Sequence, residues 1–301
     1  MHERIGLNLH RDAWPTEAVL AAHEAAGFAW LQVHTPPWRV LAERGPALAH
    51  ARALRAALGA TGLRLVVHGP DDLSVGSTDH DLAFESLLDY AAQAGAELVV
   101  YHGLNFADTG AGPAAARVCE RAQLEELSLD RLLQRALSLG VTVAIEHLAP
   151  MYAGPSTPPR RCHDPIAVRS LVRRLDSPAA GMLLDLGHLH VTADARRSDH
   201  VAVVAACARD VVLFHVHDNL GARRRGLGAP VDPLKLDLDL PPGRGSLPWA
   251  RIAPAVTGHP APLMLEVEPS QRPALDVLAA TTTRLLTVPA RSPAVPARVA
   301  A

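Results

Sequence analysis

The feature that most constrains the fold is an eightfold alternation of short apolar runs with longer amphipathic stretches rich in Ala, Leu and Arg. The apolar runs are typical of strands covered on both faces, because they are nearly continuous rather than alternately polar. We expect strands at residues 4–9, 29–34, 63–68, 97–102, 141–147, 181–186, 211–217 and 262–268. We expect helices near residues 15–26, 44–60, 79–94, 113–139, 164–175, 196–208 and 271–286.

Eight strand–helix units in one chain predict an α/β protein with a single (β/α)8 barrel over residues 1–287. The alternative is a doubly wound open sheet, but the segment after the first strand, GLNLHRD, lacks a glycine-rich phosphate-binding fingerprint. The unit after the seventh strand is replaced by a long Gly- and Pro-rich loop, residues 220–249, typical of a lid or binding loop. Residues 288–301 are Pro/Ala-rich and predict a disordered tail.

Composition narrows the class of partner. The formal net charge is −2 with no strongly basic half, which disfavours nucleic acid as the main partner. No run approaches the roughly 18 apolar residues of a membrane span, and the first residues lack the apolar core of a signal peptide. The three cysteines are far apart and form no CxxC pair. We therefore expect a cytoplasmic protein that acts on a small molecule, and homo-oligomerisation stays open.

Seven of the eight expected strands end in His, Asp or Glu. The residues are His34, His68, His102, Glu146 with His147, Asp185, His215 with His217, and Glu266 with Glu268. In a (β/α)8 barrel these ends meet at the face that carries the active site. Neighbouring carboxylates repel one another unless protons or a cation neutralise them, and imidazole with carboxylate suits a divalent transition metal. The sequence therefore predicts a metal site at this face.

Single positions have simpler interpretations that must be weighed. His34 alone would be an ordinary strand-end residue, and Asp185 could serve as the N-cap of the next helix. Glu146 and Glu266 are harder to explain in this way, because each follows an apolar run and would be buried. Buried glutamates are rare without a partner. The convergence of several such residues on one rim, rather than any one of them, carries the metal-site hypothesis.

With these residues the chain resembles the xylose isomerase-like barrel superfamily, which includes sugar phosphate isomerases and epimerases and endonuclease IV. The resemblance covers roughly residues 4–286 and rests on the order of short motifs at successive strand ends. These motifs are AIEHL with Glu146, LDLGH with Asp185 and His188, FHVHDN with His215 and Asp218, the loop LPPGRG, and LMLEVE with Glu266. His147 departs from the family pattern, which has Asn after the strand-five Glu.

The resemblance implies a metal quartet like that of the ketose 3-epimerases, formed by Glu146, Asp185, His215 and Glu266. In those enzymes a metal such as Mn²⁺, Co²⁺ or Mg²⁺ holds two adjacent oxygens of an open-chain sugar and stabilises an enediolate. Glu146 and Glu266 would then act as acid and base, and His188 would orient a substrate hydroxyl. His217 shares the strand face of His215 and is a second candidate ligand.

The resemblance to endonuclease IV implies a larger set of metal ligands, which would bind zinc. Its additional ligands correspond to His68, His102 and His188, and to an Asp-x-His that stands here as Asp237-Leu-Asp239. The final His is thus replaced by Asp239, so the resemblance does not extend to this ligand of the third zinc. The Arg223-Arg224-Arg225 run is either a solvated loop or a grip on a substrate phosphate or carboxylate, with Arg223 as the candidate.

Three functions follow from these alternatives. The first is a metal-dependent isomerase or epimerase of a sugar, a sugar-derived acid or an inosose. The second keeps the barrel and the metal but is a hydro-lyase of inosose or dehydroshikimate type, or a zinc phosphodiesterase or abasic-site endonuclease. The third is a non-catalytic barrel that binds a ligand and whose metal ring is vestigial.

Overall fold

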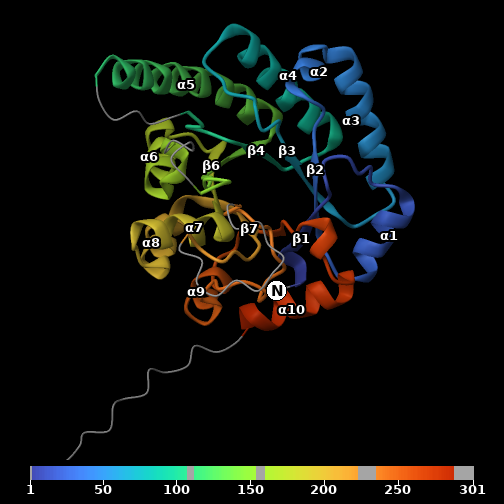
Figure 1. Cartoon of the computed structure of the whole chain (residues 1–301). Coiled ribbons are helices and arrows are strands. Elements are labelled where there is room, and N and C mark those ends of the chain that lie inside the picture. Colours follow the sequence, from blue (N-terminus) through green and yellow to red (C-terminus); the bar gives the residue numbers. More distant parts are fainter. Residues whose placement is uncertain (1, 107–111, 154–159, 223–234, 288–301) are drawn as a thin grey trace, which may run out of the picture.

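Eight parallel strands close into a barrel in the order β1 to β8 (Figure 1). The computed structural model describes residues 2–106, 112–153, 160–222 and 235–287. The strands are β1 Ile5–Asn8, β2 Trp30–His34, β3 Arg64–His68, β4 Leu98–Tyr101, β5 Thr142–Glu146, β6 Ala180–Asp185, β7 Val211–Val216 and β8 Leu263–Leu265. β8 pairs with β1, which confirms the barrel prediction and excludes the open sheet. Arg223 and the predicted tail at 288–301 lie outside the described residues.

Helices surround the barrel on its outer side (Figure 1). Their bounds are α1 Glu17–Ala25, α2 Trp38–Ala42, α3 Arg44–Leu58, α4 Thr78–Ala94, α5 Gly112–Leu139, α6 Pro165–Leu175, α7 Leu186–Arg196, α8 His200–Cys207, α9 Trp249–Thr257 and α10 Leu275–Thr287. In these described stretches no helix has both the length and the apolar character that a membrane crossing requires.

Three helices were not predicted from the sequence: α2, α7 and α9. α7 starts directly after β6, and its residues from Leu186 to Ala193 are all buried. A helix buried on all sides shows no amphipathic period, so its sequence does not reveal it. α9 follows the long loop after β7 and contains Pro254, which argues against a helix in sequence terms.

The strands are covered by apolar side chains on both faces. Outward-facing residues such as Leu31, Val67 and Ile145 pack in the main core between sheet and helices. A separate cluster fills the barrel interior: Trp30, Val66, Leu98, Val100, Ala144, Leu183, Leu213 and Met264. Because successive side chains of a strand point to opposite faces, the residue two positions after each interior residue also points inward. These later inward positions carry the candidate site.

Candidate metal centre

The inward-facing side chains change from apolar to polar at the carboxyl ends of the strands. On β3 the change is from Val66 to His68, and on β5 it is from Ala144 to Glu146. Asp185 and His215 lie at the same level of β6 and β7, where their Cα atoms are partners in the sheet. Glu266 follows β8 immediately. Strand periodicity and barrel closure therefore bring together residues far apart in the chain, as the sequence predicted.

The centre of the site is the Nδ1 atom of His215, which faces three carboxylates. It lies 3.0 Å from Glu266 Oε2, 3.2 Å from Glu146 Oε1 and 3.7 Å from Asp185 Oδ2. The ligand atoms of these four residues all lie within 4.8 Å of one another. One nitrogen and three carboxylate oxygens at this spacing form a donor set that suits a divalent transition metal.

Gln32 fixes the tautomer of His215. Its amide nitrogen donates to Glu266 Oε1 at 2.7 Å, so its oxygen remains as the acceptor 2.9 Å from His215 Nε2. His215 Nε2 is therefore a donor, and Nδ1 is the ring nitrogen that faces the carboxylates, where it holds a proton when the imidazole is charged and would bind a metal once that proton is lost. Asn8 also donates to Glu266 Oε1, at 2.8 Å. Gln32 and Asn8 are not evident from the sequence as members of the site, although Gln32 interrupts an apolar strand at an inward position.

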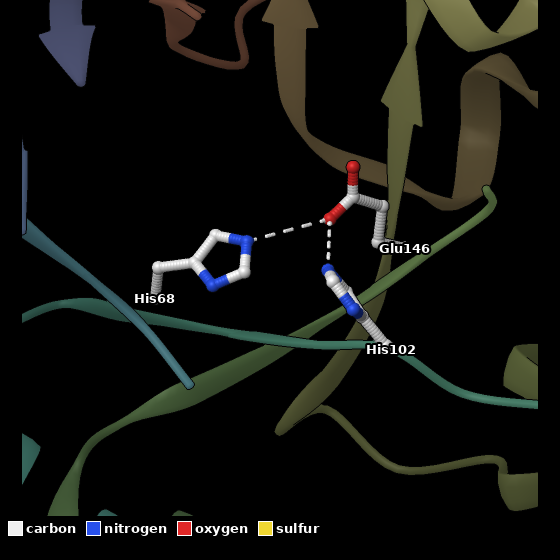
Figure 2. Close-up of side chains that lie close together, drawn as sticks. All are labelled: His68, His102 and Glu146. Carbon is white, nitrogen blue, oxygen red and sulfur yellow. Dashed lines mark ion pairs between the residues drawn. The ribbon is translucent and has the colours of Figure 1, made fainter. Parts of the chain in front are cut away.

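A second group lies on the other oxygen of Glu146 (Figure 2). His102 Nε2 is 3.1 Å and His68 Nε2 is 3.8 Å from Glu146 Oε2. The Nδ1 atom of His68 lies 2.7 Å from the carbonyl oxygen of Gly69, so Nδ1 is the donor and Nε2 is free to bind. Glu146 Oε2 is buried, and neither imidazole makes a hydrogen bond of good geometry with it. This oxygen close to two imidazole nitrogens fits a cation-binding position.

A third group surrounds Asp185. His217 Nε2 lies 2.9 Å from Asp185 Oδ1, and His188 Nε2 lies 3.1 Å from Asp237 Oδ2. Asp185 also accepts a hydrogen bond from the backbone nitrogen of His188 at 2.7 Å, so it is the N-cap of α7 as well. His217 Nδ1 is 3.5 Å from Asp239 Oδ1. The structure thus places the residue that replaces the expected His near this third group.

Gly187 explains the spacing of the LDLGH motif. A Cβ atom on this residue would collide with the imidazole ring of His217. Only glycine therefore lets the first turn of α7 pass close enough to β7 for His217 to reach Asp185.

Asp218 of the FHVHDN motif has a structural role. Its carboxylate accepts hydrogen bonds from Trp249 Nε1 at 2.8 Å, the Gly243 nitrogen at 2.9 Å and the Leu247 nitrogen at 3.0 Å. These bonds hold the LPPGRG loop against the end of β7. The next residue, Asn219, donates to Asp237 Oδ1 at 3.1 Å and so orients a residue of the third group.

The buried imidazoles and carboxylates stabilise one another's charged forms. Burial acts to raise the pKa of Glu146, but His215, His102 and His68 hold that pKa well below its usual value. Burial acts to lower the pKa of His217, yet the charge of Asp185 raises it to about 10. Burial and the charge of Asp237 raise the pKa of Asp239 to about 7. Protons on these imidazoles occupy positions that a divalent cation can take over.

A cavity of about 370 Å³ opens above these groups. Its polar lining includes His10, Arg11, His34, His68, Asp71, His102, Glu146, His188, Asp237, Asp239, Glu266 and Glu268. Among the described residues that line it, Arg11 supplies the one guanidinium group, whereas six carboxylates face the cavity. Asp185, His215 and His217 are fully buried and do not line it. Of the quartet, only Glu146 and Glu266 thus face the substrate space.

Comparison with known proteins agrees with this architecture. The family model for the xylose isomerase-like TIM barrel matches residues 20–284. No curated protein matches significantly. The fold is similar to that of a D-tagatose 3-epimerase-like protein, with a TM-score of 0.69 at 14% identity over 94% of this chain and 96% of that one.

Two further solved structures show the same fold. A D-psicose 3-epimerase gives a TM-score of 0.65 at 14% identity over 94% of this chain and 99% of that one. The probable 3-DHS dehydratase AsbF from Bacillus anthracis gives 0.66 at 13% identity, over 94% and 98% of the two chains. At such identities the similarity extends to the fold alone.

Proposed function

Because the chain belongs to the xylose isomerase-like TIM barrel family, we propose that it is a divalent-metal-dependent isomerase or epimerase. Its substrate would be a sugar, a sugar-derived acid or an inosose. The observation that supports this proposal is that Glu146 and Glu266 are the two members of the quartet that line the cavity. Two carboxylates that share a centre and face the substrate can remove a proton from carbon and return one.

The residues that would hold the metal are Glu146, Asp185, His215 and Glu266, and Mn²⁺, Co²⁺ or Mg²⁺ would suit the proposed reaction. A bound divalent ion would polarise the carbonyl group next to the reacting carbon. Asn8 and Gln32 hold Glu266 Oε1, which fixes the orientation of its carboxylate. The charge of His215 lowers the pKa of Glu266 although burial opposes this, so Glu266 is ionised and can accept a proton.

The charge of the cavity supports a neutral, polyhydroxylated substrate. Six carboxylates line the cavity and can accept hydrogen bonds from sugar hydroxyls. Arg11 is the one guanidinium in the described lining, and it already pairs with Asp71 at 2.8 Å. A phosphodiester would meet repulsion from the carboxylates unless several metal ions neutralised them.

The test is solvent deuterium incorporation during incubation of the metal-loaded protein with a panel of ketoses and inososes. We expect deuterium next to the carbonyl, and we expect Glu146→Gln and Glu266→Gln each to abolish it. Glu268→Gln is the matched control, because this half-buried carboxylate lines the same cavity but is outside the quartet. No exchange with any member of the panel, or full exchange in both glutamate variants, would overturn the proposal.

A second candidate function is favoured by His68 and His102. His68, His102 and Glu146 could hold a second ion, and Asp185, His188 and His217 could hold a third. Two or three zinc ions would activate water and clamp a phosphate, as a phosphodiesterase requires. Metal content per chain and nicking of an abasic oligonucleotide with Zn²⁺ test this candidate. One ion per chain without nicking would exclude it.

A hydro-lyase begins with the same proton removal, so the site chemistry does not separate it from an epimerase. The mass of the product does, because a lyase product has lost water whereas an isomerase product has the mass of its substrate. The same incubations used for deuterium exchange therefore distinguish the two reactions.

A further inference from the structure

A second pocket lies beside the main cavity, on its β1–β2 side. This side pocket has a volume of about 230 Å³ and lies among the segment after β1, the segment after β2, and α3. Arg11 and His34 line both spaces, so the two are adjacent and share these two side chains as a boundary. A molecule bound at the carboxylates would have to pass these two side chains to reach the side pocket.

One part of the side-pocket wall is apolar and rigid, although Arg11, Asp12 and Thr35 also line the pocket. Pro36 and Pro37 belong to this part, and proline fixes its own backbone torsion, so this wall is pre-formed. Trp14 is 38% exposed although it is one of the largest apolar side chains. Its ring meets that of His50 edge-on, with centroids 4.8 Å apart, and both residues line the pocket. An exposed indole beside a rigid wall offers a surface on which a flat ring can stack.

His50 adds a polar group to this space. Its Nδ1 atom lies within hydrogen-bond distance, 2.8 Å, of the hydroxyl of Tyr90, which is fully buried. Burial raises the pKa of Tyr90, so its hydroxyl keeps its proton. This contact orients the imidazole, whose Nε2 atom lies on the opposite side of the ring and donates or accepts according to the tautomer. The pocket therefore suits a ring that bears a polar substituent.

We propose that the side pocket binds a flat cyclic or aromatic group of the substrate, attached to the part that reacts at the carboxylates. The proposal rests on the proposed function, because that function assigns the reacting part to the main cavity. It adds that the natural substrate is larger than a simple free sugar and has two parts. Trp14 would then determine specificity without taking part in the proton transfer.

The test uses three probes and the Mn²⁺-loaded full chain. Acetohydroxamate is a metal chelator alone, 3-phenylpropanol is a ring alone, and a series of phenylalkyl hydroxamates joins the two with linkers of increasing length. We expect one joined probe to bind at least about tenfold tighter than acetohydroxamate, and Trp14→Ala to remove that advantage. Acetohydroxamate itself should bind the variant as it binds the original chain.

Met151→Ala is the matched control, since Met151 is an exposed apolar residue that lines the main cavity but not the side pocket. It should leave the advantage of the joined probe unchanged. If no linker length improves on acetohydroxamate, or if Trp14→Ala and Met151→Ala act alike, the side-pocket proposal is wrong.

The two proposals fail in different ways. If acetohydroxamate does not bind but 3-phenylpropanol binds and loses affinity in Trp14→Ala, the side pocket stands and the metal-dependent function fails. If acetohydroxamate binds and 3-phenylpropanol shows no dependence on Trp14, the side pocket fails and the metal site stands.

Discussion

Two layers of the barrel interior lie two residues apart on the same strands and behave in opposite ways. The lower layer contains Leu183 and Met264, and the upper layer contains Asp185 and Glu266. Leu183 and Asp185 are both fully buried. The lower layer stabilises the fold by removing apolar surface from water, whereas the upper layer places charges at the base of the cavity, with Asp185 buried and Glu266 in the cavity lining. The difference shows that burial alone does not define a structural role, because depth along the strand decides it.

The largest expected contrast comes from one substitution in each layer of β8. Met264→Ala should lower the free energy of unfolding by about 2–5 kcal/mol, because it leaves a cavity in the barrel interior. Glu266→Gln keeps the shape and an oxygen for Asn8 and Gln32, and it leaves His215 paired with Glu146 and Asp185. In chelator its effect should therefore be smaller than that of Met264→Ala. Urea unfolding in the presence of a chelator measures both effects.

The effect on metal content should be the reverse, with the larger loss in Glu266→Gln and the smaller in Met264→Ala. Glu266→Gln removes a charged ligand and should lose bound metal, while Met264→Ala should retain it at temperatures where the variant is folded. Mass spectrometry of the purified variants measures this. Equal metal content in the two variants would mean that the upper layer is not a metal site.

Removal of the metal gives a further comparison of the two β8 variants, through their stability. At a free metal concentration 100 times the Kd, binding to the folded state alone adds about 2.7 kcal/mol of stability. We expect a chelator to remove an increment of this order from the original chain and from Met264→Ala. Glu266→Gln should show little response to the chelator. A full response of Glu266→Gln in thermal unfolding would contradict the assignment of Glu266 as a ligand.

A smaller effect is expected from substituting the residues that form hydrogen bonds to the proposed metal ligands. Gln32→Leu removes the acceptor that fixes the tautomer of His215 and one of the two donors to Glu266. Loss of such supporting bonds typically lowers metal affinity 10- to 100-fold. Asn8→Leu removes the other donor but leaves His215 oriented, so its affinity should fall less. Competition titration with a metal indicator dye compares the two, and equal losses would show that the tautomer of His215 is unimportant.

The barrel and much of the site follow from the sequence, because strand periodicity and strand order are local and repeated. Glu146, Asp185, His215 and Glu266 could be grouped because each ends an apolar run. The role of Gln32 could not be predicted, since its partners are 183 and 234 residues away and depend on barrel closure.

The contrast between Asp185 and Asp218 was also beyond prediction. Asp185 ends a buried strand and Asp218 follows one. Asp185 faces His215 and His217, whereas Asp218 accepts hydrogen bonds from backbone nitrogens and so holds a loop in place. Residue type and spacing are the same kind of signal in both cases. Only the direction of the side chain, which β7 and its loop set in three dimensions, separates a candidate ligand from a structural acid.

A last expected effect concerns Glu125, a buried carboxylate outside the barrel interior. It accepts hydrogen bonds from Tyr101 Oη at 2.7 Å and the Leu104 nitrogen at 3.0 Å, and it is fully buried. Burial raises its pKa to about 7, because these bonds and the charge of Arg121 compensate only in part. Here a buried acid is stabilised by a proton, whereas the upper layer of the barrel stabilises its acids with imidazoles.

This difference predicts the direction in which the free energy of unfolding changes with pH. Between the unfolded pKa of about 4.3 and the folded pKa of about 7, the folded state binds more protons, so the free energy of unfolding falls as pH rises. Glu125→Gln has no such proton to lose, so the original chain should lose stability relative to the variant between pH 5 and pH 8. Urea unfolding in chelator measures this difference, in which the common titration of the barrel groups cancels. A difference that stays constant across this range would mean that Glu125 is ionised in the fold, as the barrel acids are, and that the contrast between the two kinds of buried carboxylate is false.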